Sequence, residues 1–297
     1  MLAGATPKCQ RTPPLQFAII GGMSTEPRGQ RGFRVVRGQE EREAVGRFVM
    51  AQGWAGLHLG DILRRFPDSG GTAESTLLGH FGAGGELRGV ALQHGQRAYV
   101  LLPMLEDRAL ADDFVRERLG SLERLTGVEG QLPPDLLGEQ FGSDLREMTV
   151  APVLRVPERR LPVARKARKS DSAALHRIYE QISWMRLDSA DLWAQRLSEE
   201  PSWVAEVEGR LVAAARWSKS FGQLVEVGGV ATDPASRRLG AATAVVIAAT
   251  AAALSSGLTP VLCFGDPALG PLYYQLGFER VGRERVFHRL TPSQAGI

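Results

Sequence analysis

The residue types best suited to chemistry lie between positions 230 and 243. An apolar run ends in Val230, Ala231 and Thr232, a short polar loop follows, and the spacing Arg237-x-x-Gly240-x-Ala242 then leads into an alanine-rich segment. The first turn of a helix has N–H groups without intrahelical acceptors and carries partial positive charge, so a small-residue loop before it favours phosphate. Gly240 and Ala242 let a ligand approach the backbone closely. The pattern predicts a site for the pyrophosphate of a nucleotide-like cofactor.

The elements that position this loop are predicted from periodicity in the second half of the chain. A strand opens this half, two helices follow up to about residues 182 and 197, and strands are expected at Trp203–Glu208, Leu211–Trp217 and Gln223–Val230. The remaining elements are a helix at Ser236–Ser256, a strand at Pro260–Phe264, a helix at Pro267–Leu276 and one or two strands at Phe278–Leu290. The order β-α-α-β-β-β-α-β-α-β predicts an α/β fold with a mixed sheet and helices on its faces.

The first half of the chain repeats this order of expected elements approximately. Helices are expected at Glu40–Gln52 and Leu57–Phe66, strands at Thr76–Phe81, Leu87–Leu92 and Ala98–Leu102, a helix at Ala109–Leu125 and a strand at Thr149–Val156. No counterpart of the phosphate loop is present, because the Arg116–Ser121 stretch falls within the expected helix and lacks the small residue. The halves are either related, with the loop lost from the first, or unrelated.

The length of 297 residues suits two domains, at ~150 residues per domain. We expect a disordered leader over residues 1–31, a divergent N-terminal domain over 32–154, a linker over 155–162 and a C-terminal domain over 163–297. The leader contains a second methionine, Met23, so Met1 and Met23 are alternative starts.

Charge and cysteine content exclude several classes of protein. The leader carries Lys8, Arg11, Arg28 and Arg31 against Glu26, which accounts for the whole net charge of +3 and leaves a neutral body. A neutral body does not indicate a nucleic-acid partner. The basic run over 155–169 is interpreted as a solvated linker, with docking of a phosphate-bearing partner or of nucleic acid as the alternatives. Two cysteines without a ligand cluster and no membrane-length apolar run suggest a cytoplasmic protein without a metal.

The sequence of residues 163–290 resembles the GNAT superfamily of acyl-CoA-dependent N-acyltransferases. The family's loop has the form Gln/Arg-x-x-Gly-x-Gly/Ala, which Arg237, Gly240 and Ala242 fit. Downstream the family shows Asn, then Leu-Tyr, three residues and Gly-Phe; this chain has Leu272-Tyr273 and Gly277-Phe278, with Asp266 in place of the asparagine. The first half is interpreted as a possible degenerate GNAT copy in a tandem arrangement.

The resemblance implies acetyl-CoA as co-substrate and assigns its contacts. The backbone of Val230, Ala231 and Thr232 would pair with the pantetheine arm. The backbone N–H groups of Arg238, Leu239, Gly240, Ala241, Ala242 and Thr243 would hold the pyrophosphate, with side-chain charge from Arg237 and Arg238. The alternative for the two arginines is an exposed pair without a ligand.

Two residues are candidates for proton transfer. An amine must lose a proton before it attacks a thioester, and glutamates at the strand position of Glu226 act as the base in some members of the family. Tyr273 matches the family's tyrosine near the sulfur and would protonate the leaving thiolate. The alternatives are a cross-strand ion pair for Glu226 and a core aromatic for Tyr273.

The function predicted from the sequence is transfer of acetyl from acetyl-CoA to a primary amine, by direct attack in a ternary complex. The acceptor is a small-molecule or peptide amine that the sequence does not identify. Two alternatives stay open: transfer of another acyl group, or a CoA-binding sensor with an interaction domain. Neither nucleic acid nor a membrane is expected as a partner, and a homodimer is left open.

Overall fold

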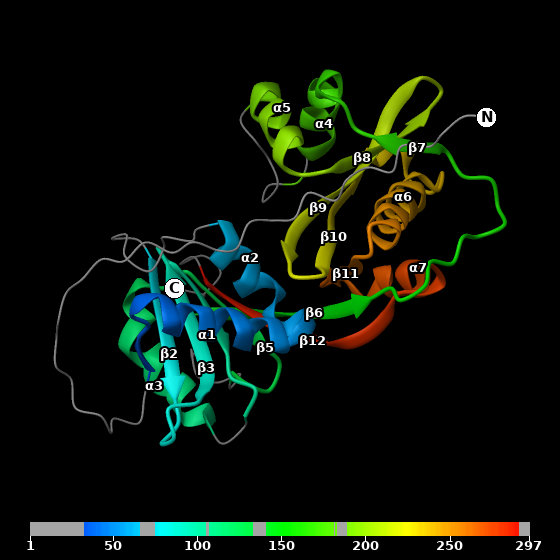
Figure 1. The fold of residues 1–297 in the computed structure, drawn as a ribbon. Helices are drawn as coiled ribbons and strands as arrows, with labels where there is room; N and C mark the ends of the chain where they lie inside the picture. Colours follow the sequence, from blue (N-terminus) through cyan, green and yellow to red (C-terminus); the bar gives the residue numbers. More distant parts are fainter. Residues whose placement is uncertain are drawn as a thin grey trace.

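One twelve-stranded mixed sheet with helices on both faces forms the framework of the molecule (Figure 1). The computed structural model describes residues 33–65, 75–104, 107–132, 141–180, 182 and 189–290, so the expected leader lies outside the described residues. The strand order is β1-β2-β3-β4-β5-β12-β6-β11-β10-β9-β8-β7. The predicted mixed α/β architecture is confirmed.

The N-terminal half contains six strands and three α-helices within the described residues. The strands are β1 (Phe33–Val35), β2 (Ser75–Phe81), β3 (Leu87–His94), β4 (Arg97–Leu101), β5 (Arg124–Val128) and β6 (Phe141–Val150). The helices are α1 (Gly38–Ala51), α2 (Leu57–Arg65) and α3 (Arg108–Arg118).

The C-terminal half follows the order that periodicity predicts. Its strands are β7 (Val163–Lys166), β8 (Ser202–Val207), β9 (Arg210–Phe221), β10 (Leu224–Thr232), β11 (Thr259–Phe264) and β12 (Glu279–Arg289). Its helices are α4 (Ser172–Tyr179), α5 (Ala190–Glu199), α6 (Ala241–Ser255) and α7 (Gly270–Gln275). The N-terminal half has the same order of strands and helices, except that its described residues contain no counterpart of α7. The two halves are therefore structural repeats.

The two halves exchange strands at the centre of the sheet. Strand β12 of the C-terminal half pairs with β5, as Val286 with Thr126, while β6 of the N-terminal half pairs with β11, as Met148 with Cys263. Strands β6 and β12 also pair with each other. The predicted division at residues 155–162 therefore separates the halves along the chain, but it does not separate two sheets.

Two predicted elements of the first half are wrong in their bounds. The helix expected at Ala109–Leu125 ends at Arg118 and gives way to strand β5, and the strand expected at Thr149–Val156 is β6, which ends at Val150. Leu122 and Leu125 are fully buried in one cluster with Phe287 of β12. This packing against a distant strand overrides the helical spacing of the apolar residues.

Each half contains one pair of parallel strands, and the pair in the C-terminal half separates toward its carboxyl end. Strand β10 pairs with β11 over Leu224–Glu226, and β4 pairs with β5 over residues 97–100. Beyond Gly228, β10 is irregular and keeps only its antiparallel partner β9. The edge of β10 that faces β11 is therefore left without a strand partner after Glu226, whereas β4 is paired with β5 over four of its five residues.

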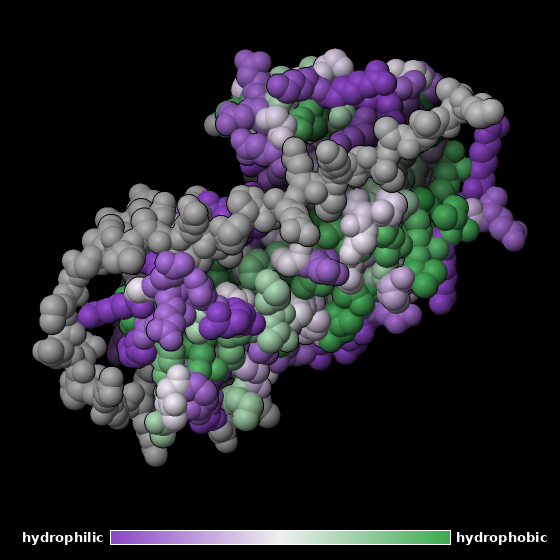
Figure 2. Space-filling model, in the orientation of Figure 1, coloured by the Kyte–Doolittle hydropathy of each residue, from purple (hydrophilic) through white to green (hydrophobic). Residues whose placement is uncertain are grey.

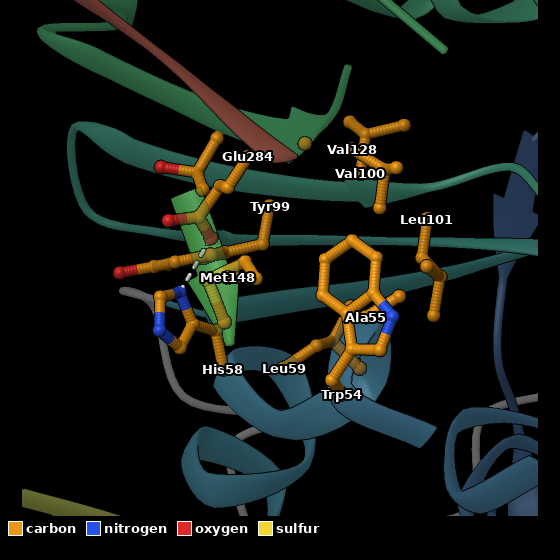
Figure 3. A pocket seen from close by; sticks show the side chains of 12 residues that line it. Trp54, Ala55, His58, Leu59, Tyr99, Val100, Leu101, Val128, Met148 and Glu284 are labelled. Atoms are coloured by element: carbon orange, nitrogen blue, oxygen red, sulfur yellow. Dashed lines mark ion pairs between the residues drawn. The ribbon is translucent and has the colours of Figure 1, made fainter. Parts of the chain in front are cut away.

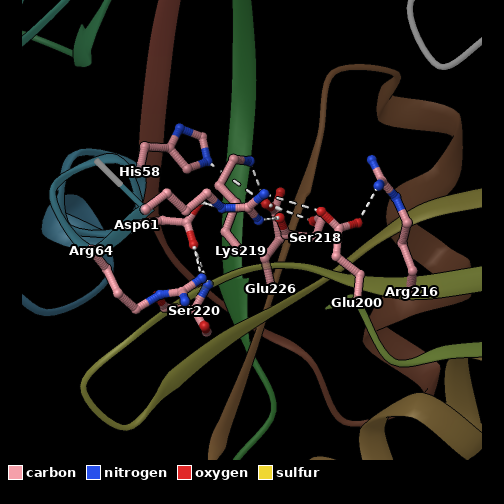
Figure 4. A network of polar contacts seen from close by, with 10 residues as sticks. His58, Asp61, Arg64, Glu200, Arg216, Ser218, Lys219, Ser220 and Glu226 are labelled. Carbon is pink, nitrogen blue, oxygen red and sulfur yellow. Dashed lines mark hydrogen bonds and ion pairs between the residues drawn. The ribbon is translucent and has the colours of Figure 1, made fainter. Parts of the chain in front are cut away.

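The buried carboxylates of Asp61 and Glu200 join the halves through hydrogen bonds and ion pairs where α2 packs on β9 (Figure 4). Asp61 accepts hydrogen bonds from Ser220 N–H at 2.9 Å and from Arg64 at 3.0 Å, while Arg65 binds Glu200 at 3.1 Å. Apolar side chains gather over the middle of the molecule, where α6 and the neighbouring strands lie (Figure 2). The halves thus share polar contacts as well as the sheet.

Candidate active site

The loop between β10 and α6 is built to leave backbone donors free. Asp233 fixes its start, since its carboxylate accepts from Ala235 N–H at 3.1 Å and binds Arg210 at 2.7 Å. Arg238 and Gly240 then take left-handed backbone conformations, with φ of +66° and +83°, and α6 begins at Ala241. A left-handed glycine immediately before the helix turns the chain sharply into its first turn.

The backbone N–H groups of residues 238–243 donate to no acceptor within the described part of the chain. The first N–H of this region to find one is that of Ala244, which donates to Gly240 O at 3.0 Å. A row of unpaired N–H groups at a helix N-terminus is the arrangement that binds phosphate oxygens. The structure therefore brings together the backbone groups that the sequence predicts for a pyrophosphate.

The free edge of β10 leads directly into this loop. Ala231 and Thr232 pair with Ala214 and Ala213 of β9, and no residue of β11 pairs with β10 after Glu226. The edge of Val230–Thr232 that faces β11 is open to an extended ligand, which would pair with it as an added strand. The predicted contacts of a pantetheine arm and a pyrophosphate are thus continuous along β10 and the loop.

The linker supplies a cation that the sequence analysis did not assign to this site. Arg159 donates from Nη2 to Thr243 Oγ1 at 3.3 Å, and a Cβ on Gly240 would lie 2.9 Å from Leu161. The linker therefore passes directly over the start of α6. The basic composition of residues 155–169 was the signal, and only the fold places one of these arginines at the loop.

Tyr273, a residue of α7, has its side chain in the apolar core. It is 4% exposed, and its ring centroid is 5.2 Å from that of Phe264 and 6.2 Å from that of Phe278. Burial raises the pKa of Tyr273 to about 12, and its hydroxyl has no hydrogen-bond partner among the described residues. The hydroxyl keeps its proton at neutral pH and is free to donate it. Its role as an acid stays a prediction.

Glu226 is the last residue of β10 that pairs with β11. Its carboxylate contacts several side chains. Lys219 Nζ and Ser218 Oγ both donate to Glu226 Oε2, and His58 Nε2 of the N-terminal half is 3.9 Å from it (Figure 4). Burial alone would raise the pKa of Glu226, but the charges of Lys219 and His58 and the two hydrogen bonds lower it to about 2. Glu226 is thus ionised but weakly basic in this arrangement, and its role as a base stays a prediction.

A buried tyrosine of α4 fixes the irregular part of β10. Tyr179 donates from its hydroxyl to Gly229 O at 2.6 Å, and its ring stacks on Trp193 with centroids 4.4 Å apart. Burial raises the pKa of Tyr179, so the hydroxyl remains a donor. Sequence reasoning missed this residue, because its contact to Gly229 spans 50 positions.

Two negative findings apply to the described residues. They contain no cluster of His, Cys, Asp and Glu side chains that could hold a metal ion. None of their helices combines the length and the apolar character needed to cross a bilayer.

Residues 170–278 match the model of the Acetyltransferase (GNAT) family. A search of curated proteins finds no match. Among solved structures, the fold is similar to that of an acetyltransferase from the GNAT family from Colwellia psychrerythraea, with a TM-score of 0.58, 13% identity, and coverage of 87% of this chain and 99% of that chain. A GCN5-related N-acetyltransferase from Kribbella flavida has a TM-score of 0.53 at 18% identity, with 84% and 97% covered.

A third solved structure has the tandem arrangement. It is a tandem GNAT protein from the clavulanic acid biosynthesis pathway, with a TM-score of 0.50, 14% identity, and coverage of 83% of this chain and 93% of that chain. These likenesses concern the fold. The predicted resemblance to the GNAT superfamily is confirmed for residues 170–278. The tandem arrangement is matched at the level of the fold.

Proposed function

We propose that this protein, whose residues 170–278 form a GNAT domain, transfers the acetyl group of acetyl-CoA to a primary amine by direct attack in a ternary complex. The observation that carries the proposal is the row of unpaired N–H donors at residues 238–243, continuous with the free edge of β10. The pyrophosphate binds the loop, the pantetheine pairs with Val230–Thr232, and Arg237, Arg238 and Arg159 add positive charge. A cytoplasmic location and a small-molecule or peptide acceptor belong to the proposal.

The reaction needs two proton movements. The neutral amine nitrogen attacks the thioester carbonyl, the C–S bond breaks, and the amide forms while the CoA thiolate leaves. The amine gives up one proton to Glu226, which passes it to solvent because a carboxylate with a pKa of about 2 does not retain it. Tyr273 donates its proton to the departing sulfur and recovers one from solvent, so amine and acetyl-CoA become amide and CoA.

Acyl-CoA binding is tested with Ala242→Glu and its neutral match, Ala242→Gln. Ala242 lies in the first turn of α6, where a negative side chain suits the helix dipole, so the glutamate variant keeps its fold. It places a negative charge beside the pyrophosphate. We expect Ala242→Glu to lower the affinity for acetyl-CoA at least tenfold in isothermal titration calorimetry, and Ala242→Gln to lower it less than threefold. Equal affinities of both variants and wild type would remove the loop from the site.

Turnover separates the proposal from its alternatives. The release of CoA thiol is measured with a panel of primary amines and with acetyl-, propionyl- and succinyl-CoA. Turnover with an amine and acetyl-CoA supports the proposal, and faster turnover with a longer donor supports a different acyl group. The ion pair between Glu226 and Lys219 favours the second candidate, a CoA-binding sensor, which predicts tight binding of acetyl-CoA without turnover.

A further inference from the structure

The irregular part of β10 contains one residue more than the strand beside it. Between Gly228 and Ala231, two residues of β10 lie opposite the single residue Ala215 of β9. These two residues are Gly229, which has a left-handed φ of +60°, and Val230. An extra residue of this kind is a β-bulge, which interrupts the ladder and changes the direction of the peptide groups at that place.

The bulge lies where the proposed complex brings the acyl group. In that complex the pyrophosphate binds residues 238–243, and the pantetheine runs from there along β10, from Thr232 back to Val230. The thioester at the far end of the pantetheine then lies beside the bulge. Glu226, the proposed base, is a residue of the same strand. The peptide groups of the bulge are therefore next to the reacting carbonyl.

One buried side chain holds the bulge from the side of α4. Tyr179 donates from its hydroxyl to Gly229 O at 2.6 Å. Its ring stacks on that of Trp193 with 4.4 Å between centroids and 10° between planes, and both residues are 1% exposed. Trp193 belongs to α5, so the packing of two helices fixes the place of the hydroxyl. Burial raises the pKa of Tyr179, so the hydroxyl remains a donor at neutral pH.

A hydrogen bond to one side of a peptide group also acts on its other side. Gly229 O and the N–H of Val230 belong to one peptide, which is planar and trans, so the two groups point in opposite directions. By fixing the carbonyl, Tyr179 fixes the direction of the Val230 N–H. The hydrogen bond that Gly229 O accepts also polarises the peptide and strengthens this N–H as a donor.

The N-terminal half has neither the bulge nor the tyrosine in the corresponding elements. Strand β4, the counterpart of β10, pairs with β3 in unbroken register, and α1, the counterpart of α4, contains no tyrosine. Beside β4 and β5, Trp54 and His58 occupy the space and leave room for about one water molecule (Figure 3). The bulge and its tyrosine therefore occur in the half that has the open strand edge and the phosphate loop.

We propose that Tyr179 is a positioning residue for acyl transfer, whose hydroxyl holds the bulge so that the N–H of Val230 donates to the thioester oxygen. This inference rests on the proposed function, which places the acyl group beside the bulge. Negative charge develops on that oxygen as the amine attacks, so a fixed donor stabilises the transition state more than the ground state. Tyr179 acts through the backbone of β10 and not on the substrate itself.

The first test measures binding, which needs no acceptor. S-ethyl-CoA has a methylene group in place of the thioester carbonyl of acetyl-CoA. In isothermal titration calorimetry of the full-length protein, we expect wild type to bind acetyl-CoA at least threefold more tightly than S-ethyl-CoA. Tyr179→Phe keeps the ring on Trp193 and removes the hydroxyl. It should bind the two ligands equally, with the affinity for S-ethyl-CoA within twofold of wild type.

The second test is turnover with the amine that the panel of acceptors identifies. Tyr179→Phe should lower kcat at least tenfold and by a larger factor than it raises the KM for acetyl-CoA. Ile178→Val is the control, because it shortens the neighbouring buried side chain of α4 and leaves the hydrogen bond to Gly229 in place. It should change neither the ratio of the two affinities nor kcat by more than twofold.

Three results would overturn the role of Tyr179 and leave the proposed function intact. The first is equal binding of acetyl-CoA and S-ethyl-CoA by wild type, a measurement that needs no variant. The second is the same affinity ratio in wild type and Tyr179→Phe. The third is an equal loss of kcat in Tyr179→Phe and Ile178→Val, which would show a purely structural role. A wild-type protein that binds neither ligand would overturn the proposed function and this inference with it.

Discussion

At the scale of single residues, the assignment of Glu226 depends on its partner Lys219. The lowered pKa of Glu226 means that the ion pair stabilises the fold above the ordinary value of 4.5, and this contribution is lost as the pH falls toward 2. Lys219 is 30% exposed, so solvent screens part of the interaction. Variants that remove Glu226 or Lys219 in turn therefore distinguish a purely structural ion pair from catalysis by Glu226.

We expect Glu226→Gln to lower the free energy of unfolding by about 1–3 kcal/mol, because it leaves Lys219 without a counter-ion. If Glu226 accepts the proton of the amine, Glu226→Gln also loses turnover. Lys219→Met then retains turnover and moves the acid limb of the rate to higher pH, since the pKa of Glu226 rises. Chemical denaturation and pH–rate profiles provide the measurements. Full turnover in the double variant Glu226→Gln/Lys219→Met would show that Glu226 only neutralises Lys219.

The variant Tyr273→Phe tests whether Tyr273 donates the proton to the departing sulfur. The hydroxyl makes no hydrogen bond to the described residues, so its removal should leave stability within about 0.5 kcal/mol of wild type. Loss of the proton donor should lower kcat at least tenfold, with the KM for acetyl-CoA changed less than threefold. Tyr274→Phe is the matched control, since it removes a more exposed hydroxyl that binds Glu147. A kcat that is unaltered in Tyr273→Phe across the pH range would exclude Tyr273 from the reaction.

At the scale of elements, the sequence predicted the loop before α6, but it did not predict that the linker lies over this loop. The spacing of Arg237, Gly240 and Ala242 is local, and a helix N-terminus after a strand has free donors whatever surrounds it. The contact of Arg159 with Thr243 joins positions 84 residues apart, so no local pattern contains it. The bounds of α3 and β5 were missed for the same reason, because partners in β12 decide them.

The turn between α7 and β12 holds the first residues of the linker in place. Gly277 has a φ of +93°, and a Cβ there would lie 2.1 Å from Val153 O, while Arg155 N–H donates to Leu276 O at 2.9 Å. We expect Gly277→Ala to lower the free energy of unfolding by about 2 kcal/mol or more, because it combines backbone strain with a steric clash.

The control for Gly277→Ala is Gly46→Ala within α1. A Cβ at Gly46 meets nothing within 4 Å, so this change should raise the free energy of unfolding by up to about 1 kcal/mol. Urea denaturation of both variants measures the two effects. A Gly277→Ala variant as stable as wild type would mean that the linker is not tied to the turn.

At the scale of the whole molecule, the exchange of β6 and β12 makes the two halves interdependent. A C-terminal half alone would lack β5 and β6, so β11 would lose one of its two neighbours and β12 would lose both. We therefore expect fragments 1–157 and 158–297 to be poorly folded when expressed separately. When expressed together, they should copurify as a stable complex that binds acetyl-CoA.

A tag on one fragment and circular dichroism of each fragment alone test this expectation. Because the break lies in a linker without regular structure, it leaves every strand intact. A separate C-terminal fragment that is folded, monomeric and able to bind acetyl-CoA would show that the exchanged strand is dispensable.

The sequence alone determined the order of elements in the C-terminal half, the mixed sheet, the GNAT resemblance and the loop at residues 230–243. Each of these depends on periodicity or on spacing within a few turns of one chain segment. Only the tertiary structure decided that β6 and β12 change places between the halves, that Glu226 is paired with Lys219, and that Arg159 lies over the loop. It also decided that Tyr179 binds Gly229 at the bulge of β10. These contacts join residues that are far apart in the chain, and pairing of distant strands leaves no local pattern in sequence.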